Sequence, residues 1–367
     1  MTGPLPTDEP DDGSEMVPFD DVQSDVIDTE DGGAIVIMGE DEDAEDGEFY
    51  ANLADENGPL ADTEAAHLGT MLLDLISKDK EARKRRDEQY EEGIRRTGLG
   101  DDAPGGASFT GASKVVHPML TEACVDFASR AMKELFPPSG PAKMLIPGKS
   151  TDAKVAKAAR KANLMNWQMT VQCPEFRAEL EQTMTQVPLG GSQYTKYDWD
   201  KARNRPRPLF VAIDDMLLPY AATNFYSSQR KTHVQYLTQL EYEARVKDGM
   251  YRDVDLTPVG MEPDLTGAGK ASDRIEGREQ SSYNEDGLRT IYECHVTMEI
   301  AADPKGGGPA PYIVTIDRPT NRVLSVYRNW AEDDESREEL QWFVEWPFIP
   351  WRGAYAIGLP HMIGGLS

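Results

Sequence analysis

The sequence predicts an α+β protein in which a helical region precedes a region of strands. Between residues 61 and 190, apolar side chains recur at intervals of three and four residues, which is typical of amphipathic helices. Between residues 191 and 345, apolar and polar residues alternate in short runs, which is typical of strands. The excess of acidic residues is confined to the segment before the helical region. We therefore expect a folded region preceded by an acidic tail.

Residues 1–60 are predicted to be a disordered acidic tail. The 367-residue chain contains 65 acidic and 38 basic residues, a formal net charge of −27. Residues 1–60 hold 20 of the acidic residues, no basic residue and one short apolar run, 34–38. Such a segment cannot bury enough apolar surface to offset the entropy lost on folding. Residues 78–367 are close to neutral, because they carry 42 acidic and 38 basic residues.

Two features of the composition exclude classes of protein. Cys124, Cys173 and Cys294 are scattered without the spacing of a disulfide framework or a zinc site, which is consistent with a reducing compartment. The N-terminus lacks the basic-then-apolar pattern of a secretory signal, and no stretch approaches 18 consecutive apolar residues. We therefore expect no export by such a signal and no contact with a membrane.

A long charged helix is expected from about Asp62 to Arg96, because apolar residues recur at helical spacing in its first half. Opposite charges lie four residues apart, as in Asp79 and Arg83, which predicts ion pairs on the helix surface. The basic run 84–86 is compatible with nucleic-acid binding. The interleaved acidic residues favour a solvated helix face instead.

The next helix is expected to end sharply at Phe136. Apolar residues at spacings of three and four predict its buried face: Leu120, Cys124, Phe127, Ala131 and Leu135. Pro137 and Pro138 follow, and proline cannot continue a helix because its ring lacks the N–H and clashes with the preceding turn. Gly140 and Pro141 then redirect the chain, so we expect a rigid corner. Two further helices are predicted over 152–171 and 175–187.

Residues 191–345 are expected to form strands and their connections. Six runs have the pattern of strands: 192–200, 208–214, 229–237, 290–300, 312–317 and 322–327. Thr238 and Glu241 form a Thr-x-x-Glu capping box, which predicts a short helix. The polar, glycine-containing stretch 252–288 predicts a long loop. Residues 346–367, with aromatic residues and prolines, are expected to lead into a further, stem-like element.

The motifs predict no catalytic, cofactor-binding or metal site, and we do not expect an enzyme. Residues 148–150 (Gly-Lys-Ser) match the end of a phosphate-binding loop, but Lys143 stands where that loop requires glycine. Asp214 and Asp215 follow a strand, where two carboxylates can hold a metal ion. Adjacent carboxylates at a strand end are more often solvated. A metal-dependent enzyme that uses Asp214 and Asp215 therefore remains an alternative.

Three stretches of the sequence resemble the portal proteins of tailed bacteriophages, in particular those of short-tailed phages. They are SFTGASKVVHPMLTEACVDFASRAMKELFPPSGPAK (108–143), DDMLLPYAATNFYSSQRKTHVQYLT (214–238) and WFVEWPFIPWRGAYAIGLPHMIGGLS (342–367). Residues 1–77 lie outside the resemblance. The resemblance implies a portal-like wing of helices and a β-rich middle region. It also implies truncation before the remaining stem, wing and crown, because members of the family are longer.

The function implied by this resemblance is that of a ring of twelve identical subunits at one vertex of the capsid. Such rings occur in the virion, and in the host cytoplasm during assembly. They dock the terminase, tail adaptor proteins and capsid or scaffold proteins, and they pass double-stranded DNA through a channel. The near-neutral charge of residues 78–367 predicts passage of DNA without tight binding, since tight binding requires Lys and Arg to neutralise phosphates.

Six residues are predicted to support the fold or the contacts between subunits: Phe127, Phe136, Pro137, Pro138, Trp351 and Arg352. The corner after Phe136 is expected to set the direction of the chain for ring closure. Head-to-tail contacts close into a ring only when the rotation from one subunit to the next is fixed. A monomeric scaffold or adaptor protein with an acidic tail is a second alternative.

Overall fold

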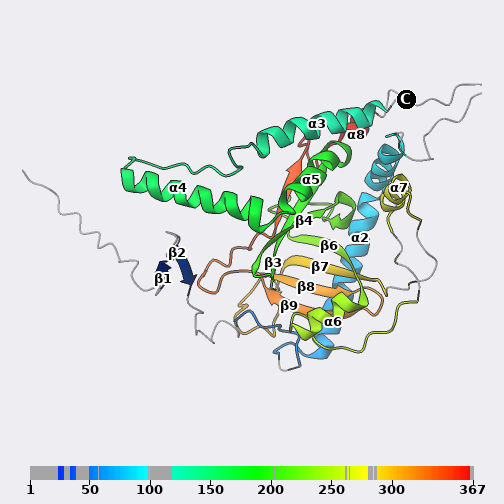
Figure 1. Ribbon diagram of the computed structural model, residues 1–367. Helices are drawn as coiled ribbons and strands as arrows, with labels where there is room; N and C mark the ends of the chain where they lie inside the picture. Colours follow the sequence, from blue (N-terminus) through cyan, green and yellow to red (C-terminus); the bar gives the residue numbers. More distant parts are fainter. Residues whose placement is uncertain are drawn as a thin grey trace, which may run out of the picture. The chain divides into compact units, whose positions relative to one another are not determined.

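A computed structural model describes residues 24–28, 34–38, 49–56, 58–97, 99, 118–201, 203–260, 263, 265–279, 284 and 287–363 of the chain (Figure 1). The chain divides into two units, Met1–Glu48 and Phe49–Ser367. In the first unit, strand β1 (Ser24–Asp28) pairs antiparallel with strand β2 (Ala34–Met38). Both strands are rich in β-branched residues, which favour strands. The prediction of a disordered tail is wrong for these two strands, and the rest of residues 1–48 lies outside the described residues.

The second unit contains helices and antiparallel sheets, which confirms the α+β class. Its helices are α2 (Asp62–Arg95), α3 (Met119–Leu135), α4 (Asp152–Trp167), α5 (Phe176–Gly190), α6 (Gln239–Lys247), α7 (Gly267–Ile275) and α8 (Leu359–Ile363). A π-helical turn, Gln168–Gln172, continues α4. The predicted capping box opens α6, and α5 continues through Pro188 to its last turn.

The strands of this unit form two antiparallel sheets. One has the order β5-β6-β7-β8-β9 and the other the order β10-β3-β4. The strands are β3 (Ser192–Asp200), β4 (Arg205–Val211), β5 (Met216–Leu217), β6 (Arg230–Leu237), β7 (Arg289–Met298), β8 (Ala310–Asp317), β9 (Arg322–Arg328) and β10 (Phe343–Pro347). All six predicted runs form strands, although β4 begins and ends three residues early. The sequence did not predict β5 and β10.

The folded unit begins earlier than predicted, because residues 49–60 contribute to its core. Phe49 and Leu53 are buried beside the five-stranded sheet. The backbone N–H of Leu53 donates to the carbonyl of Val326 at 2.9 Å, and the N–H of Val326 donates to the Asn52 side chain at 2.9 Å. This segment therefore lies along the edge strand β9. The predicted end of the tail at residue 60 is wrong because the few apolar residues of the segment face the core.

Helix α2 contributes to both main cores of the second unit. In its first half, Leu72 and Ile76 are buried against the five-stranded sheet. In its second half, Tyr90 and Ile94 are buried in a separate core with residues from α3, α5 and β3. Figure 1 shows this helix in light blue, running beside the five-stranded sheet. Helix α2 therefore connects the two main cores of the unit.

Helix α3 packs on α5 and the segment after β10 in a third core. Its buried residues follow a row of i,i+4 positions: Leu120, Cys124, Ala128 and Met132. Phe127 is only partly buried, and Leu135 is exposed. The predicted face is correct in the first half of the helix and wrong in the second. A row of i,i+4 positions drifts around the helix, and such rows form the ridges that pack against a neighbouring helix.

The predicted loop 252–288 contains a helix, so that prediction is wrong for α7. The hydroxyl of Thr266 accepts a hydrogen bond from the N–H of Gly269 at 3.0 Å and caps the helix. Ala268 and Ala271 are buried, and α7 packs against α2. Two glycines in nine residues give the segment a low intrinsic helix propensity. Contact with α2, which the local sequence does not encode, stabilises it.

A buried polar cluster connects the two sheets. Lys196 on β3 lies 2.6 Å from both carboxylate oxygens of Glu293 on β7, and His295 Nε2 lies 2.9 Å from Oε1 of the same residue. Gln235 Nε2 donates to Glu293 at 2.7 Å and lies 3.1 Å from Nδ1 of His233. Burial raises the pKa of Glu293, but Lys196 and His295 hold it well below its usual range. Burial, aided by the charge of Lys196, lowers the pKa of His233 to about 3.

We expect acid to destabilise this unit in part through His233. Its folded pKa of about 3 lies below the ordinary value of 6.5, so the unfolded chain takes up the proton first. The contribution to stability is therefore complete above about pH 6.5 and is lost as the pH falls toward 3. His233→Phe should reduce the slope of the free energy of unfolding between about pH 6 and pH 4, by up to about 1.4 kcal/mol per pH unit.

Urea denaturation at a series of pH values measures this slope. His67→Phe, at an exposed position on α2, is the matched control and should leave the slope unchanged. Equal slopes for His233→Phe and the unmodified protein would contradict the burial argument.

Candidate functional site

Arg83 lies where α2 meets the connection from β4 to β5, and its guanidinium is buried. Nη1 donates to the backbone carbonyls of Ile213 and Met216, at 3.0 and 2.6 Å. Nε and Nη2 donate to Oδ1 of Asp87 at 2.8 and 2.5 Å. The ring of Tyr355 lies with its centroid 5.4 Å from the guanidinium carbon. The buried charge is therefore matched by a carboxylate, two carbonyls and an aromatic face.

The ion pair predicted between Asp79 and Arg83 does not form. Asp79 instead accepts three hydrogen bonds from Arg230 on β6, at 2.9, 2.8 and 2.6 Å, and both side chains are nearly buried. Arg83 takes its carboxylate from Asp87, one turn further along α2. The spacing in the sequence allows either partner for Arg83. The position of β6, which is distant in sequence, decides between them.

Arg86, the last residue of the predicted basic run, is turned toward the protein. Its Nη2 donates to the carbonyls of Gly190 and Ala356 at 2.8 and 2.7 Å, and its guanidinium lies 5.0 Å from the ring centroid of Tyr355. The two basic residues before it are exposed. The prediction of a solvated helix face is correct for those two residues and wrong for Arg86. Arg86 instead fastens α2 to the end of α5 and to the segment after β10.

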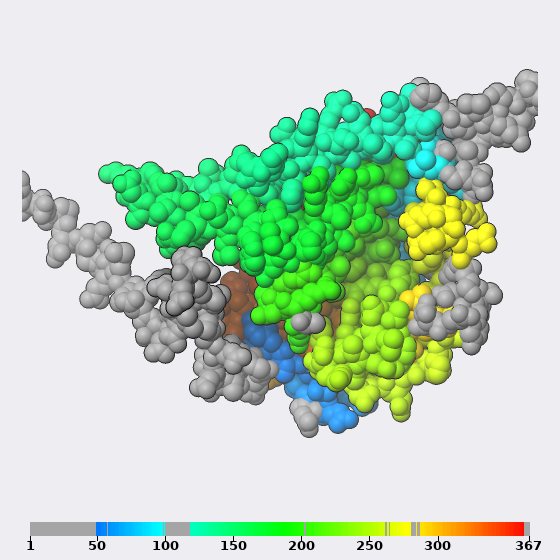
Figure 2. Space-filling view, in the orientation of Figure 1, coloured from blue at the N-terminus to red at the C-terminus, as the bar shows by residue number. Residues whose placement is uncertain are grey.

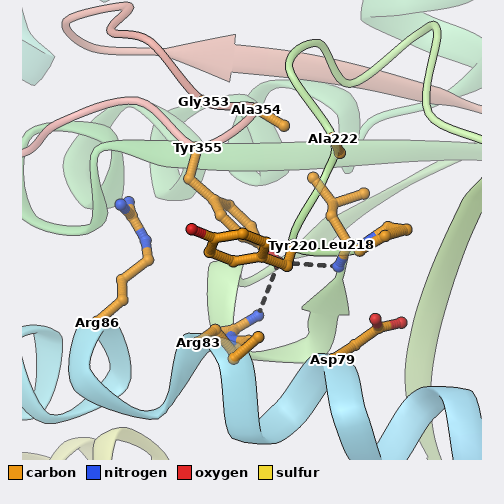
Figure 3. Close-up of a pocket in the computed structure, with 11 residues that line it drawn as sticks. Asp79, Arg83, Arg86, Leu218, Tyr220, Ala222, Gly353, Ala354 and Tyr355 are labelled. Atoms are coloured by element: carbon orange, nitrogen blue, oxygen red, sulfur yellow. Dashed lines mark hydrogen bonds between the residues drawn. The ribbon is translucent and has the colours of Figure 1, made fainter.

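A pocket of about 220 Å³ lies over this junction (Figure 3). Its lining comes from α2 and from two loops: Asp79, Ala82, Arg83, Arg86, Leu218, Pro219, Tyr220, Ala222, Gly353, Ala354 and Tyr355. Among these described residues there is no serine, cysteine, histidine or lysine that could act as a nucleophile or base. The carboxylate and the guanidinium groups of the lining bind other groups of the protein. The charged groups of the lining therefore hold α2 and the two loops together at this junction.

Asp214 and Asp215 lie in a short 3-10 turn between β4 and β5. Oδ2 of Asp214 accepts a hydrogen bond from the Thr266 hydroxyl at 2.6 Å. Burial and the charge of Asp214 raise the pKa of Asp215 to about 8, against the opposing charge of Arg83. Within the described residues, no group of three or more His, Cys, Asp or Glu is placed to hold a metal ion.

Two of the predicted contact residues pack inside the unit. The ring of Phe127 meets Phe348 edge to face, with centroids 5.3 Å apart. The ring of Phe136 lies 6.2 Å from that of Phe176. Both phenylalanines border the core between α3 and α5. Their aromatic rings therefore stabilise the fold of the single chain.

The predicted helix stop is confirmed, because α3 ends one residue before Phe136. The N–H of Gly140 donates to the carbonyl of Pro137 at 2.9 Å, which closes a turn around Pro138. Gly140 has φ +94°, and a Cβ there would lie 2.5 Å from the Asn166 side chain. The Asn166 amide accepts from the N–H of Ala142 at 2.8 Å and donates to its carbonyl at 3.2 Å. The corner is therefore held by an amide clamp as well as by the prolines.

Residues 137–172, hereafter the arm, stand off the rest of the unit (Figure 2). The arm consists of the corner, an extended stretch, α4 and the π-helical turn, and no residue of α4 is buried. Its C-terminal base is attached by Cys173, whose thiol donates to the carbonyl of Pro206 at 3.0 Å. Arg205 also binds there, to the carbonyl of Gln172 and to Glu175. Both ends of the arm are thus fixed while its length is exposed.

Trp351 and Arg352 lie on an exposed loop beside the pocket, and Trp351 is 73% exposed. The loop is held by the N–H of Ala354, which donates to the carbonyl of Ala222 at 3.1 Å. Tyr220, at the edge of the pocket, is 87% exposed. The sequence analysis did not single out Tyr220. The only sequence feature that marks it is its position directly after Pro219. Each of the two loops that line the pocket thus carries one exposed aromatic side chain.

The chain matches no known family model and none of the curated proteins. The likeness to portal proteins thus depends on the three quoted stretches, of which residues 108–117 and 364–367 lie outside the described residues. In the part of the chain that the structure describes, no helix has the length and apolar character needed to cross a bilayer.

We expect Arg83→Met to destabilise the second unit by about 3–5 kcal/mol, because removing one partner leaves Asp87 and two buried carbonyls without a cation. Thermal and urea denaturation measure this effect. Arg85→Met, two residues along the same helix and exposed, should change the free energy of unfolding by about 0.5 kcal/mol or less. Equal stability of the two variants would show that Arg83 does not carry the junction.

Asp215→Asn should stabilise the protein at neutral and alkaline pH. Its folded pKa of about 8 exceeds the ordinary value of 3.8, so the folded state keeps a proton that the unfolded chain releases. Stability therefore falls as the pH rises from about 4 to 8, and asparagine removes this loss. We expect a gain on the order of 1 kcal/mol or more at pH 7, and none at pH 4. Asp333→Asn, at an exposed position, is the control. A gain in the free energy of unfolding that does not depend on pH would contradict the raised pKa of Asp215.

Proposed function

We propose that this chain is a subunit of a phage portal ring, a structural protein and not an enzyme. The ring would provide a channel for viral DNA during packaging and ejection, and a platform for the terminase, tail adaptor proteins and capsid or scaffold proteins. Its place is the portal vertex of the virion, and the host cytoplasm during assembly. The quoted stretches suggested this function, and one structural observation carries it further.

That observation is the exposure of the arm. Most helices in proteins are stable because one face packs against other elements, and a helix of this length without packing is marginal in water. Helix α4 has no buried residue in its own chain. A neighbouring subunit would supply the missing contact. The rigid attachment of both ends of the arm supports this role, since a ring requires each contact to point in one direction.

The exposed aromatic side chains on the two loops beside the pocket also support assembly. Trp351 and Tyr220 are among the most exposed large apolar side chains of the described residues. Tyrosine, tryptophan and arginine are enriched in the centres of protein interfaces. Arg352 is exposed next to Trp351. The loop that carries them thus provides groups suited to a subunit or partner contact.

The placement of basic residues supports a channel that does not hold DNA tightly. Five arginines are buried in ion pairs within the unit, where they cannot neutralise phosphates: Arg83, Arg205, Arg252, Arg289 and Arg328. Tight DNA binding requires exposed Lys and Arg at the phosphates. A wall with few such groups would let DNA slide.

The complete gene product that carries this chain tests the proposal. Native mass spectrometry and negative-stain imaging should give closed rings with a central hole, twelve subunits in each. A monomer at micromolar concentration would contradict the proposal and favour an adaptor protein with an acidic tail. Metal-dependent turnover that is lost in Asp214→Asn would favour the enzyme alternative instead.

The corner gives a second test of ring geometry. Pro137→Ala together with Pro138→Ala removes the ring clash that ends α3, so the helix can extend and redirect the arm. We expect folded subunits that form rings of wrong or mixed size, or open arcs, by native mass spectrometry. Pro258→Ala, in an exposed loop, is the control. Closed rings identical to those of the unmodified protein would show that the two prolines only end a helix.

A further inference from the structure

The arm differs in charge from the body to which it is attached. It contains one acidic residue, Asp152, and six basic ones: Lys143, Lys149, Lys154, Lys157, Arg160 and Lys161. The rest of the folded unit, residues 49–136 and 173–367, contains 46 acidic and 32 basic residues. The net charges are therefore +5 for the arm and −14 for the body. Opposite net charges on two surfaces of one molecule favour contact between two copies.

The exposed side of α4 is divided into a basic half and an apolar half. Residues 157, 160, 164, 167 and 171 follow one another at intervals of three or four, so they lie along one side of the helix. Lys157 and Arg160 occupy the first half of this row. Leu164, Trp167 and Val171 occupy the second and are 56%, 48% and 61% exposed. Such a row is suited to a protein surface that is acidic at one end and apolar at the other.

We propose that the arm of one copy docks, through this row, on the acidic body of a neighbouring copy. The proposal rests on the proposed function, in that it names the contact by which subunits would join. Figure 2 shows the arm, in green, projecting from the body. The arm and the acidic body are different surfaces. The contact is therefore head-to-tail: each copy inserts one arm and receives one, and repetition at a fixed rotation closes a ring.

The chemistry of the row favours a protein surface over DNA as the occupant. Phosphates would pair with Lys157 and Arg160, but they offer nothing to Leu164, Trp167 and Val171. The corner also fixes the arm at one angle through Asn166 and Gly140. A fixed angle is required when one copy must meet the next in a defined orientation.

Photo-crosslinking between unlabelled and ¹⁵N-labelled copies of the protein tests the contact directly. A photoreactive phenylalanine analogue replaces Trp167 in the complete gene product, and light and ¹⁵N-labelled copies are mixed before assembly. We expect light–heavy crosslinks from position 167 to residues 49–136 or 173–367. The analogue at Leu240, an exposed position on α6, is the control and should give few such crosslinks. Crosslinks confined to one copy, or between two arms, would overturn the proposal.

Charge reversal provides the second test. Lys157→Glu with Arg160→Glu should weaken assembly at least tenfold, with circular dichroism unchanged. The variant still has an intact acidic body, so a mixture with the unmodified protein should give open arcs and pairs. Lys201→Glu with Lys247→Glu makes the same change of charge at exposed positions outside the arm and should leave the rings intact.

The outcomes separate this proposal from the function on which it rests. Normal rings in the Lys157 and Arg160 variant would overturn the docking of the arm and leave the ring intact. A monomeric unmodified protein would overturn both. Salt-dependent binding of a short DNA duplex in fluorescence anisotropy, lost in the same variant while the rings persist, would assign the arm to nucleic acid and also overturn the proposal.

Discussion

The buried charge of Arg83 is the interaction on which the arrangement of the second unit depends. A buried guanidinium without partners costs several kcal/mol, so the fold must keep its partners in place. Those partners are Asp87 on the same helix and the carbonyls of Ile213 and Met216 in the connection between the two sheets. Helix α2 belongs to two cores, and the charge lies between them. Satisfying Arg83 therefore fixes the helix, the connection and, through them, the angle between the sheets.

The same requirement divides the surface of the molecule by charge. Arginines that pair with buried carboxylates, such as Arg289 with Asp317 and Arg328 with Asp303, are removed from the surface. Many of the body's cations thus neutralise its own interior. The cations of α4 have no such role, since the helix has no buried residue. The arm is therefore the basic part of an acidic molecule, and its cations stay at the surface.

The sequence predicted those parts of the fold that depend on local patterns. The alternation of apolar and polar residues predicted six of the eight strands of the second unit, and the proline pair predicted the end of α3.

The rest of the fold depends on contacts between distant residues. Phe49 and Leu53 were assigned to the tail because their contact with β9 is not visible in the chain around them. Helix α7 was missed because α2 stabilises it. Asp79 was paired with Arg83 because the competing partner, Arg230, lies on a strand more than a hundred residues away. The pocket and the exposure of the arm follow from the same distant contacts. The corner at Pro137 was predicted, but its clamp by Asn166 was not.

That clamp matters because the arm amplifies angular error. Helix α4 has 16 residues, which at 1.5 Å per residue extend about 24 Å. A change of about 10° at the corner would then move the far end of such a helix by about 4 Å, by the same rise per residue. This displacement is longer than a hydrogen bond and comparable to the separation of two packed carbon atoms.

Prolines alone restrict φ and leave ψ free, so they end a helix without fixing the direction of the next segment. Asn166 forms two hydrogen bonds with the backbone of Ala142. Gly140 lies so close to Asn166 that only a residue without a Cβ fits there. Together these contacts fix the direction of the chain after the prolines. The contact proposed for the arm, if it repeats around a ring, requires precision of this kind.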